Sequence, residues 1–303
     1  MAQRNAESTE RGSAAGKSPV AEVADTPVAE NRAERLFPTV GDIAMMLLLF
    51  FLSQGVTGVL FAAFGFAIPD LPDVRDGVEE FMAAQVLRGE RIAVIYPVSM
   101  LVLLLSIYLY VRLRGGRWRV ARFSASGFNP NIILSGIVWI VAAQIVLEPI
   151  MALLPSVDNA GVGRGFWACV TAMVFAPVCE EMLCRGIILE TLRRRWGKAV
   201  AVAVSALFFG IVHVEPATAL AGVVVGTIFG MIYLRTSSLF STIILHSINN
   251  SIALALICLD MDKVPVRDML GNDIAYYAVY NVACVLVLLF FVETSRKVFR
   301  KKQ

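Results

Sequence analysis

The chain has 303 residues, of which 57% are hydrophobic and 17% are charged, and its formal net charge is +3. Soluble globular proteins carry about 25% charged residues, so this composition excludes an ordinary soluble domain and indicates a polytopic membrane protein. So small a net charge says little about partners. The clusters of basic residues are typical of topological anchors rather than of a nucleic-acid surface, and we expect the lipid bilayer to be the main partner.

The first part of the chain differs in composition from the rest. Residues 1–36 are rich in Ala, Glu, Ser, Arg and Pro and contain no aromatic residue. Such a segment cannot bury enough apolar surface to offset the conformational entropy that is lost on folding. We expect residues 1–36 to form a disordered cytoplasmic tail.

Long apolar stretches follow this tail. An α-helix of about 20 apolar residues spans the hydrocarbon core of a bilayer, and the sequence offers about eight such stretches. They lie near 42–67, 91–112, 131–153, 166–189, 199–214, 217–235, 238–259 and 274–293. We therefore predict an all-α fold, a polytopic transmembrane bundle of about eight helices. N-terminal transmembrane helices occupy 37–164, and a C-terminal transmembrane helix with a basic cytoplasmic tail occupies 256–303.

The basic residues predict how the bundle is oriented. Most of the 27 Lys and Arg residues fall on the side that would hold both termini. Basic residues accumulate on the cytoplasmic side of membrane proteins. We expect an integral multi-pass membrane protein with both termini in the cytoplasm. The acidic connection 69–90 is then expected on the opposite side, as a loop with at most a short amphipathic helix.

Ionisable groups within the apolar stretches are the strongest sign of function. The chain has only two histidines, His213 and His246, and each lies in an apolar segment. Another segment carries Glu180, Glu181 and Arg185 in the sequence CEEMLCR. Ionisable groups at such depth are costly to insert and are functional candidates by default.

Helical spacing separates the roles of the two glutamates. Residues four apart share a helical face, so Glu181 and Arg185 can form a supporting ion pair. Glu180 lies about 100° away around the helix and has no built-in partner. It is therefore the carboxylate that is available for chemistry.

Each histidine also has a partner four residues away. Phe209 can place an aromatic ring beside His213, and His246 shares a helical face with Asn250. The carboxamide of Asn250 has no titratable proton, so it can only donate or accept hydrogen bonds. Two spans thus supply an imidazole each, and one of them adds an amide.

Together these groups can hydrolyse a peptide bond. A water held between Glu180 and His213 can be deprotonated and attack a carbonyl carbon, while His246 and Asn250 donate hydrogen bonds to the oxyanion. The alternative for each group taken singly is a polar bridge between helices. The joint placement of both histidines near a pair of glutamates favours the catalytic interpretation.

Two further kinds of chemistry stay as alternatives. The five cysteines lack the spacing of a metal site and suit packing, although Cys179 or Cys184 can also be considered as a nucleophile beside the acids. No H-E-x-x-H pairing is present, so we predict no metal site and no cofactor. Zinc is not excluded, because Glu and His side chains can ligate it.

Three motifs in order resemble the signatures of a known family. CEEMLCR, FGIVH and HSINN follow the patterns E-E-x-x-x-R, F-x-x-x-H and H-x-x-x-N. The chain thereby resembles the CAAX-protease and bacteriocin-processing family of intramembrane glutamate proteases, also called the abortive-infection family. The resemblance implies that Glu180 and His213 activate water, that His246 and Asn250 form an oxyanion hole, and that the remaining motif residues support them. These supporting residues are Glu181, Arg185 and Phe209.

The resemblance implies a catalytic transmembrane core over 165–255 and a membrane endopeptidase of the CAAX prenyl endopeptidase type. Its substrate would be a membrane-associated peptide or a lipidated protein, while neither the substrate nor the oligomeric state can be read from the sequence. One alternative is a non-proteolytic scaffold or bacteriocin-immunity protein. Another is a proton-coupled transporter, which needs further buried charge, and only Glu148 in the third span offers any.

Overall fold

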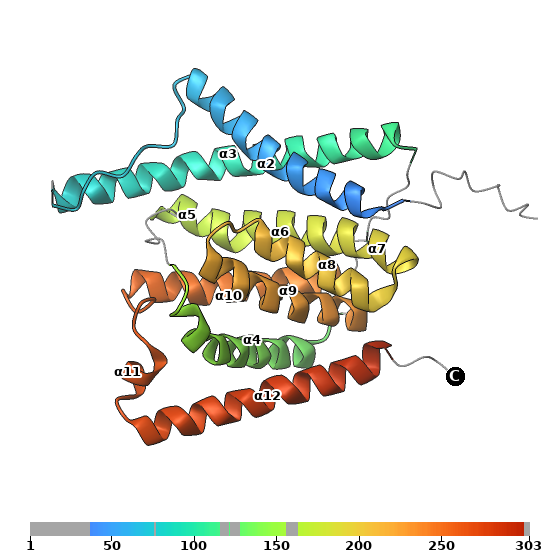
Figure 1. Cartoon of the computed structure of the whole chain (residues 1–303). Helices are drawn as coiled ribbons and strands as arrows, with labels where there is room; N and C mark the ends of the chain where they lie inside the picture. The colour runs from blue at the N-terminus through green and yellow to red at the C-terminus, as the bar shows by residue number, and fades with distance from the viewer. Residues whose placement is uncertain (1–36, 76, 116–120, 122–127, 156–162, 300–303) are drawn as a thin grey trace, which may run out of the picture.

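The computed structural model describes residues 37–75, 77–115, 121, 128–155 and 163–299 (Figure 1). Within these ranges the chain forms helices and contains no strand. The predicted all-α polytopic bundle is confirmed. The tail predicted for residues 1–36 lies outside the described residues.

The helices follow one another in chain order. Before the motifs lie α2 (Val40–Ala63), α3 (Val78–Leu113) and α4 (Pro130–Met151). A nearly continuous helical run then comprises α5 (Phe166–Val170), a π-helical segment (Thr171–Phe175), α6 (Ala176–Glu181), a second π-helical segment (Met182–Leu189) and α7 (Glu190–Arg195). The remaining helices are α8 (Gly197–Ile211), α9 (Pro216–Thr236), α10 (Leu239–Cys258), α11 (Val266–Leu270) and α12 (Asp273–Phe299).

The predicted membrane spans correspond closely to these helices. Among the described residues, six helices are long and apolar enough to cross a membrane, namely α2, α3, α4, α9, α10 and α12. The predicted span 166–189 falls on the run α5 to α7, whose regular helical turns are interrupted by the two π-helical segments. The predicted span 199–214 falls on α8, which has 15 residues. The chain is an integral membrane protein.

Helix α3 is longer than the sequence suggests. The segment 69–90 is expected to be a loop, but residues 78–90 belong to α3, a helix of 36 residues. Glu79 and Glu80 in the first turn favour this early start, because they interact well with the positive end of the helix dipole. The segment just before α5 also stabilises this extension, because the Arg164 backbone N–H donates to the Gln85 carbonyl oxygen at 3.0 Å.

Helix α9 lies at the centre of the bundle. Its most apolar stretch is 61% buried, against 11% for α12. In Figure 1, α2 and α3 lie on one side of the run α5 to α7, while α4 and α12 lie on the opposite side of the molecule. Helices α8 and α9 approach closely at Gly210, where the Cβ of any larger residue would come 2.6 Å from the Ala219 carbonyl oxygen. Small residues permit such contacts between transmembrane helices.

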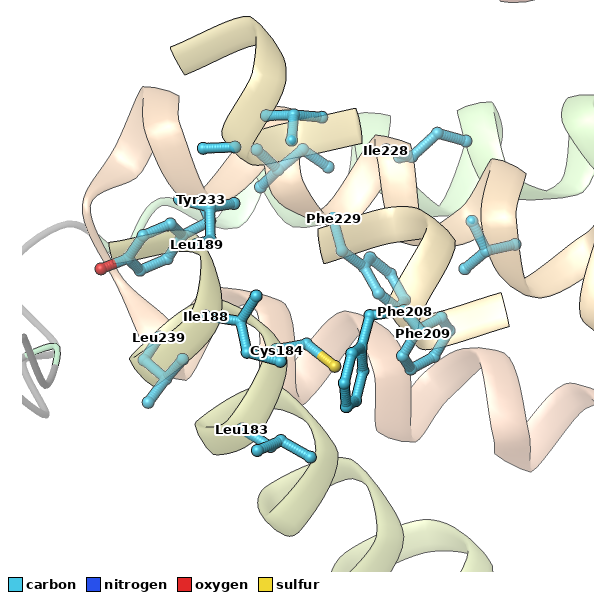
Figure 2. Packing of buried hydrophobic residues seen from close by; sticks show 14 of the residues in the cluster. Leu183, Cys184, Ile188, Leu189, Phe208, Phe209, Ile228, Phe229, Tyr233 and Leu239 are labelled. Atoms are coloured by element: carbon cyan, nitrogen blue, oxygen red, sulfur yellow. The ribbon is translucent and has the colours of Figure 1, made fainter. Parts of the chain in front are cut away.

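Apolar side chains from the helical run, α8 and α9 fill the space between these helices (Figure 2). Cys184 lies in this cluster with Phe208 and Phe209, and its exposure is 1%. A side chain so enclosed by apolar groups behaves as a small packing residue. The structure therefore supports the packing interpretation of Cys184 over the nucleophilic one.

Candidate active site

The two adjacent glutamates lie on α6, between the two π-helical segments. Pro177, in the first turn of α6, has no N–H to donate to the preceding turn, which interrupts the regular α-helical ladder. π-Helical turns inside α-helices occur frequently at functional sites. Glu180 and Glu181 thus lie between two irregular segments of the run, where Glu180 contacts Tyr96 on α3 and Glu181 contacts His246 on α10.

Glu181 and Arg185 form the ion pair that their spacing predicts. Arg185 Nη1 lies 2.6 Å from Glu181 Oε1, and both side chains are fully buried. Arg185 Nη2 also donates to the Gly226 carbonyl oxygen at 2.9 Å. The guanidinium lies over the rings of Phe209 and Phe229, at 4.7 and 5.3 Å from their centroids. Arg185 is therefore tied to the helical run, α8 and α9 at once.

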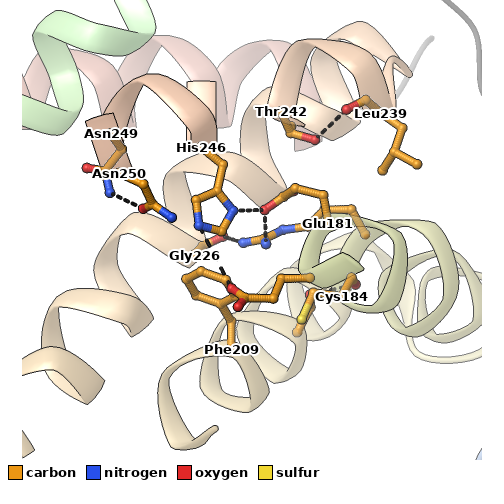
Figure 3. A network of polar contacts seen from close by, with 12 residues as sticks. Glu181, Cys184, Phe209, Gly226, Leu239, Thr242, His246, Asn249 and Asn250 are labelled. Atoms are coloured by element: carbon orange, nitrogen blue, oxygen red, sulfur yellow. Dashed lines mark hydrogen bonds and ion pairs between the residues drawn. The ribbon is translucent and has the colours of Figure 1, made fainter. Parts of the chain in front are cut away.

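His246 on α10 contacts Glu181 (Figure 3) and faces Glu180. Its Nδ1 lies 3.1 Å from Glu181 Oε1, and its Nε2 lies 3.8 Å from Glu180 Oε2. An ionised carboxylate can only accept, so the Nδ1–H of His246 donates to Glu181. The ring packs between Phe209 and Phe229, with centroid distances of 5.4 and 5.3 Å. This packing fixes the plane of the imidazole and turns Nε2 toward Glu180.

Glu180 is the more accessible of the two glutamates. Its side chain is 14% exposed, whereas that of Glu181 is not exposed. Its Oε1 accepts a hydrogen bond of 2.8 Å from the Tyr96 hydroxyl, and its Oε2 faces His246. No hydrogen bond or ion pair joins Glu180 to Arg185 within the part of the chain that the structure describes. The two neighbours therefore differ in environment, as their helical positions predict.

Tyr96 is a site residue that the sequence motifs do not reveal. It lies on α3 and is 84 residues from Glu180 in the chain. The only local signal is a tyrosine followed by Pro97 inside an apolar helix, which does not reveal the partner of its hydroxyl. A contact over such a separation depends on how α3 docks against the helical run.

His213 lies just after the end of α8. Its Nδ1 lies 2.7 Å from the Phe209 carbonyl oxygen, and the two rings are in edge contact at 4.9 Å, as the F-x-x-x-H spacing predicts. A carbonyl can only accept, so Nδ1 carries the hydrogen and Nε2 of the neutral ring is an acceptor. Among the described residues no hydrogen bond joins His213 directly to Glu180. The Nε2 of His213 is thus available as a hydrogen-bond acceptor. His213 and Glu180, which are predicted to bind the same water, are not directly hydrogen-bonded to each other in the described structure.

Asn250 lies one turn after His246 on α10. Its Nδ2 donates to the Ala172 carbonyl oxygen at 2.9 Å, and its Oδ1 accepts from Asn249 at 3.2 Å. Ala172 belongs to the first π-helical segment, so Asn250 links α10 to the irregular part of the helical run. The amide nitrogen has two hydrogens. One is engaged with Ala172, and the other can serve a further acceptor.

The structure therefore brings Glu180, Glu181, Arg185 and His246 into one contact network, with Phe209 packed against it. His213 and Asn250 lie close to this network in the chain, at one turn from Phe209 and His246 respectively. Across the described ranges, no group of three or more His, Cys, Asp or Glu side chains is arranged to hold a metal ion.

The three motifs fall in one stretch of the chain. Residues 163–252 match the family model of the Rce1-like type II CAAX prenyl endopeptidases. This match confirms the family resemblance that the motifs predict, and it supports a membrane endopeptidase. Helices α2, α3 and α4 lie outside the matched residues. The chain has no match among curated proteins or among solved structures.

Proposed function

We propose that the chain is a metal-independent, glutamate-type intramembrane endopeptidase in which Glu180 is the general base. The observation that carries the proposal is the difference between the two glutamates. Glu181 is buried and neutralised by Arg185, while Glu180 is partly exposed and has no cationic Arg partner in the described structure. A carboxylate that is held in place and not neutralised by a permanent cation such as Arg185 can accept a proton from water.

His213 is proposed to orient the water. Because its Nδ1–H is held by the Phe209 carbonyl, its Nε2 can accept a hydrogen bond from the same water that Glu180 deprotonates. The water oxygen then attacks the scissile carbonyl carbon, and the carbonyl becomes an oxyanion. The proton of that water goes to the carboxylate of Glu180.

His246 and Asn250 are proposed to stabilise the oxyanion. Asn250 offers its second amide hydrogen, and His246 offers Nε2–H when its ring is doubly protonated, because Nδ1–H already serves Glu181. Such donors act most strongly on the charge that develops in the transition state. Collapse of the intermediate re-forms the carbonyl and breaks the C–N bond. Glu180 returns its proton to the departing amine.

The substrate is proposed to be a membrane-associated peptide, either lipidated or unmodified. The test is cleavage by the purified chain of a prenylated peptide and of its unmodified counterpart, each with and without a chelator. Hydrolysis that survives the chelator supports the glutamate mechanism. Loss of activity with the chelator, and its recovery when zinc is added, would overturn the metal-independent mechanism.

Asn250→Ala is expected to reduce kcat by about 100- to 1000-fold, as the loss of one oxyanion donor does, with KM little changed. The reduction in kcat is measured as the turnover of the purified variant per folded molecule, relative to that of the parent. Asn281→Ala is the matched control, since Asn281 also donates its amide to a backbone carbonyl, that of Tyr277 on α12. A defect of Asn250→Ala confined to KM would show that Asn250 binds substrate or joins helices instead.

Both termini are proposed to be cytoplasmic. Most Lys and Arg residues are predicted on the side of the membrane that holds the two termini, and basic residues accumulate on the cytoplasmic side. In a chain whose natural cysteines are replaced, a single cysteine at Val20 or at Lys301 is expected to be shielded from an impermeant maleimide in intact cells. A cysteine at Asp268, in the connection between α10 and α12, should react. Labelling at Val20 or Lys301 without permeabilisation would refute this orientation.

A further inference from the structure

The carboxylate of Glu180 is in contact with a helix that carries none of the three motifs. The hydroxyl of Tyr96 on α3 donates to Glu180 Oε1 at 2.8 Å. Tyr96 lies outside the residues 163–252 that match the family model. The contact therefore adds a residue from the N-terminal helices to the proposed site.

Tyr96 is itself held by a second polar contact. The Ser99 hydroxyl lies 2.8 Å from the Tyr96 carbonyl oxygen and 2.7 Å from Gln54 Oε1 on α2. Ser99 is fully buried, and Gln54 Nε2 further contacts the Met100 sulfur at 3.7 Å. Polar side chains in a transmembrane bundle commonly join helices in this way. The backbone that carries Tyr96 is thus tied to α2 next to the site.

The two oxygens of Glu180 face different neighbours. Oε1 accepts from Tyr96, and Oε2 lies 3.8 Å from His246 Nε2, which is beyond hydrogen-bond distance. A glutamate side chain rotates about several bonds and loses this freedom when it is ordered. The phenol hydroxyl fixes one oxygen, so the other is held toward His246 and remains able to take a proton.

We propose that Tyr96 is a positioning residue that orients the carboxylate of Glu180 for water activation. This inference rests on the proposed function, because it has meaning only if Glu180 is the base. The hydroxyl acts through Glu180 and takes no part in proton transfer. Removal of a hydrogen bond to a charged group changes a rate or an equilibrium by about 10- to 100-fold.

The test compares Tyr96→Phe with the parent chain in the peptide-cleavage assay. The variant keeps the ring and loses only the hydroxyl, so kcat is expected to fall by about 10- to 100-fold while KM and the thermal unfolding midpoint change little. Tyr110→Phe is the matched control on the same helix. Its hydroxyl donates to Asp42 on α2 at 2.5 Å, and its removal is expected to leave kcat unchanged.

Each outcome decides between defined alternatives. If Glu180→Gln is active in the same assay, the proposed function fails, and the inference about Tyr96 fails with it. If Glu180→Gln is inactive and Tyr96→Phe has the kcat of the parent, only the positioning role fails. An increase in KM at constant kcat would make Tyr96 a substrate contact and would overturn the positioning role.

A packing role is tested by a second substitution. If Tyr96→Phe retains full activity and Tyr96→Leu loses both activity and folded protein, the ring is needed for packing and the hydroxyl is not, which overturns the inference. If Tyr96→Phe lowers the amount of folded protein, activity per folded molecule is compared. If the activity of Tyr96→Phe per folded molecule equals that of the parent, the positioning role of Tyr96 is also overturned.

Discussion

Glu180→Gln is expected to lower peptide hydrolysis by about 100- to 10,000-fold, the range that positioned acid–base groups contribute. Glutamine keeps the size of the side chain and can still accept the Tyr96 hydroxyl hydrogen bond at Oε1. It cannot take a proton from water. The variant should therefore have the unfolding midpoint of the parent and almost none of its turnover.

Glu190→Gln provides a matched control. Glu190 on α7 is also a buried glutamate that accepts from a tyrosine, Tyr233, and pairs with Arg193 at 2.7 Å. It lies outside the contact network around Glu180 in the described structure. We expect its substitution to leave kcat within a few-fold of the parent, so that loss of a buried carboxylate by itself does not account for an inactive Glu180→Gln.

Full turnover by folded Glu180→Gln would favour a different function. The scaffold interpretation requires that a partner-binding role survive this substitution. The transporter interpretation requires further buried charge, and Glu148 is the one candidate from the sequence. In the structure Glu148 Oε1 accepts from the Val266 backbone N–H at 2.7 Å, so it anchors the start of α11. This contact gives Glu148 a structural role at the end of α4.

Contacts between residues four apart in the chain could be predicted from the sequence. The pairing of Glu181 with Arg185 and the ring contact of Phe209 with His213 follow from residues four apart on a helix. The membrane spans could be predicted because apolar length alone selects them. Each of these features depends on a local pattern.

Contacts between helices could not be predicted in the same way. The approach of Tyr96 to Glu180 and of Asn250 to the Ala172 carbonyl depends on docking geometry, which a single sequence does not display. The early start of α3 escapes prediction for a related reason. Its acidic residues suggest a loop, but the segment is stabilised by packing against α5 and by the Arg164 backbone contact.

The bond between His246 and Glu181 changes how the second glutamate is understood. The i,i+4 spacing in the sequence predicts one partner for Glu181, Arg185. In the structure, both Arg185 and His246 contact Glu181 Oε1. Glu181 therefore both neutralises a buried cation and holds the imidazole of a proposed oxyanion donor. This second role suggests that removing Glu181 affects catalysis as well as folding.

Glu181→Ala is expected to destabilise the protein by about 3–5 kcal/mol, because removing one partner of a buried pair leaves an uncompensated charge. Arg185 would keep the Gly226 carbonyl and the aromatic rings around it but lose its only anion in the described structure. The expected result is a much smaller amount of folded protein, measured by size-exclusion chromatography and by the thermal unfolding midpoint in detergent.

Glu293→Ala is the control, because Glu293 and Lys297 form an ion pair of the same i,i+4 spacing on an exposed part of α12. Exposed pairs contribute about 0–1 kcal/mol, so its unfolding midpoint should hardly change. An unfolding midpoint for Glu181→Ala equal to that of the parent would contradict the assigned role of the buried pair.

The double substitution Glu181→Leu with Arg185→Met separates folding from catalysis. Replacing both members of a buried pair by apolar residues of similar size is often neutral or stabilising, so folded protein should return toward the parental amount. His246 would still lack the acceptor for its Nδ1–H and would lose its orientation relative to Glu180. We therefore expect a folded protein with strongly reduced kcat. Recovery of both folding and turnover would show that Glu181 serves only to neutralise Arg185.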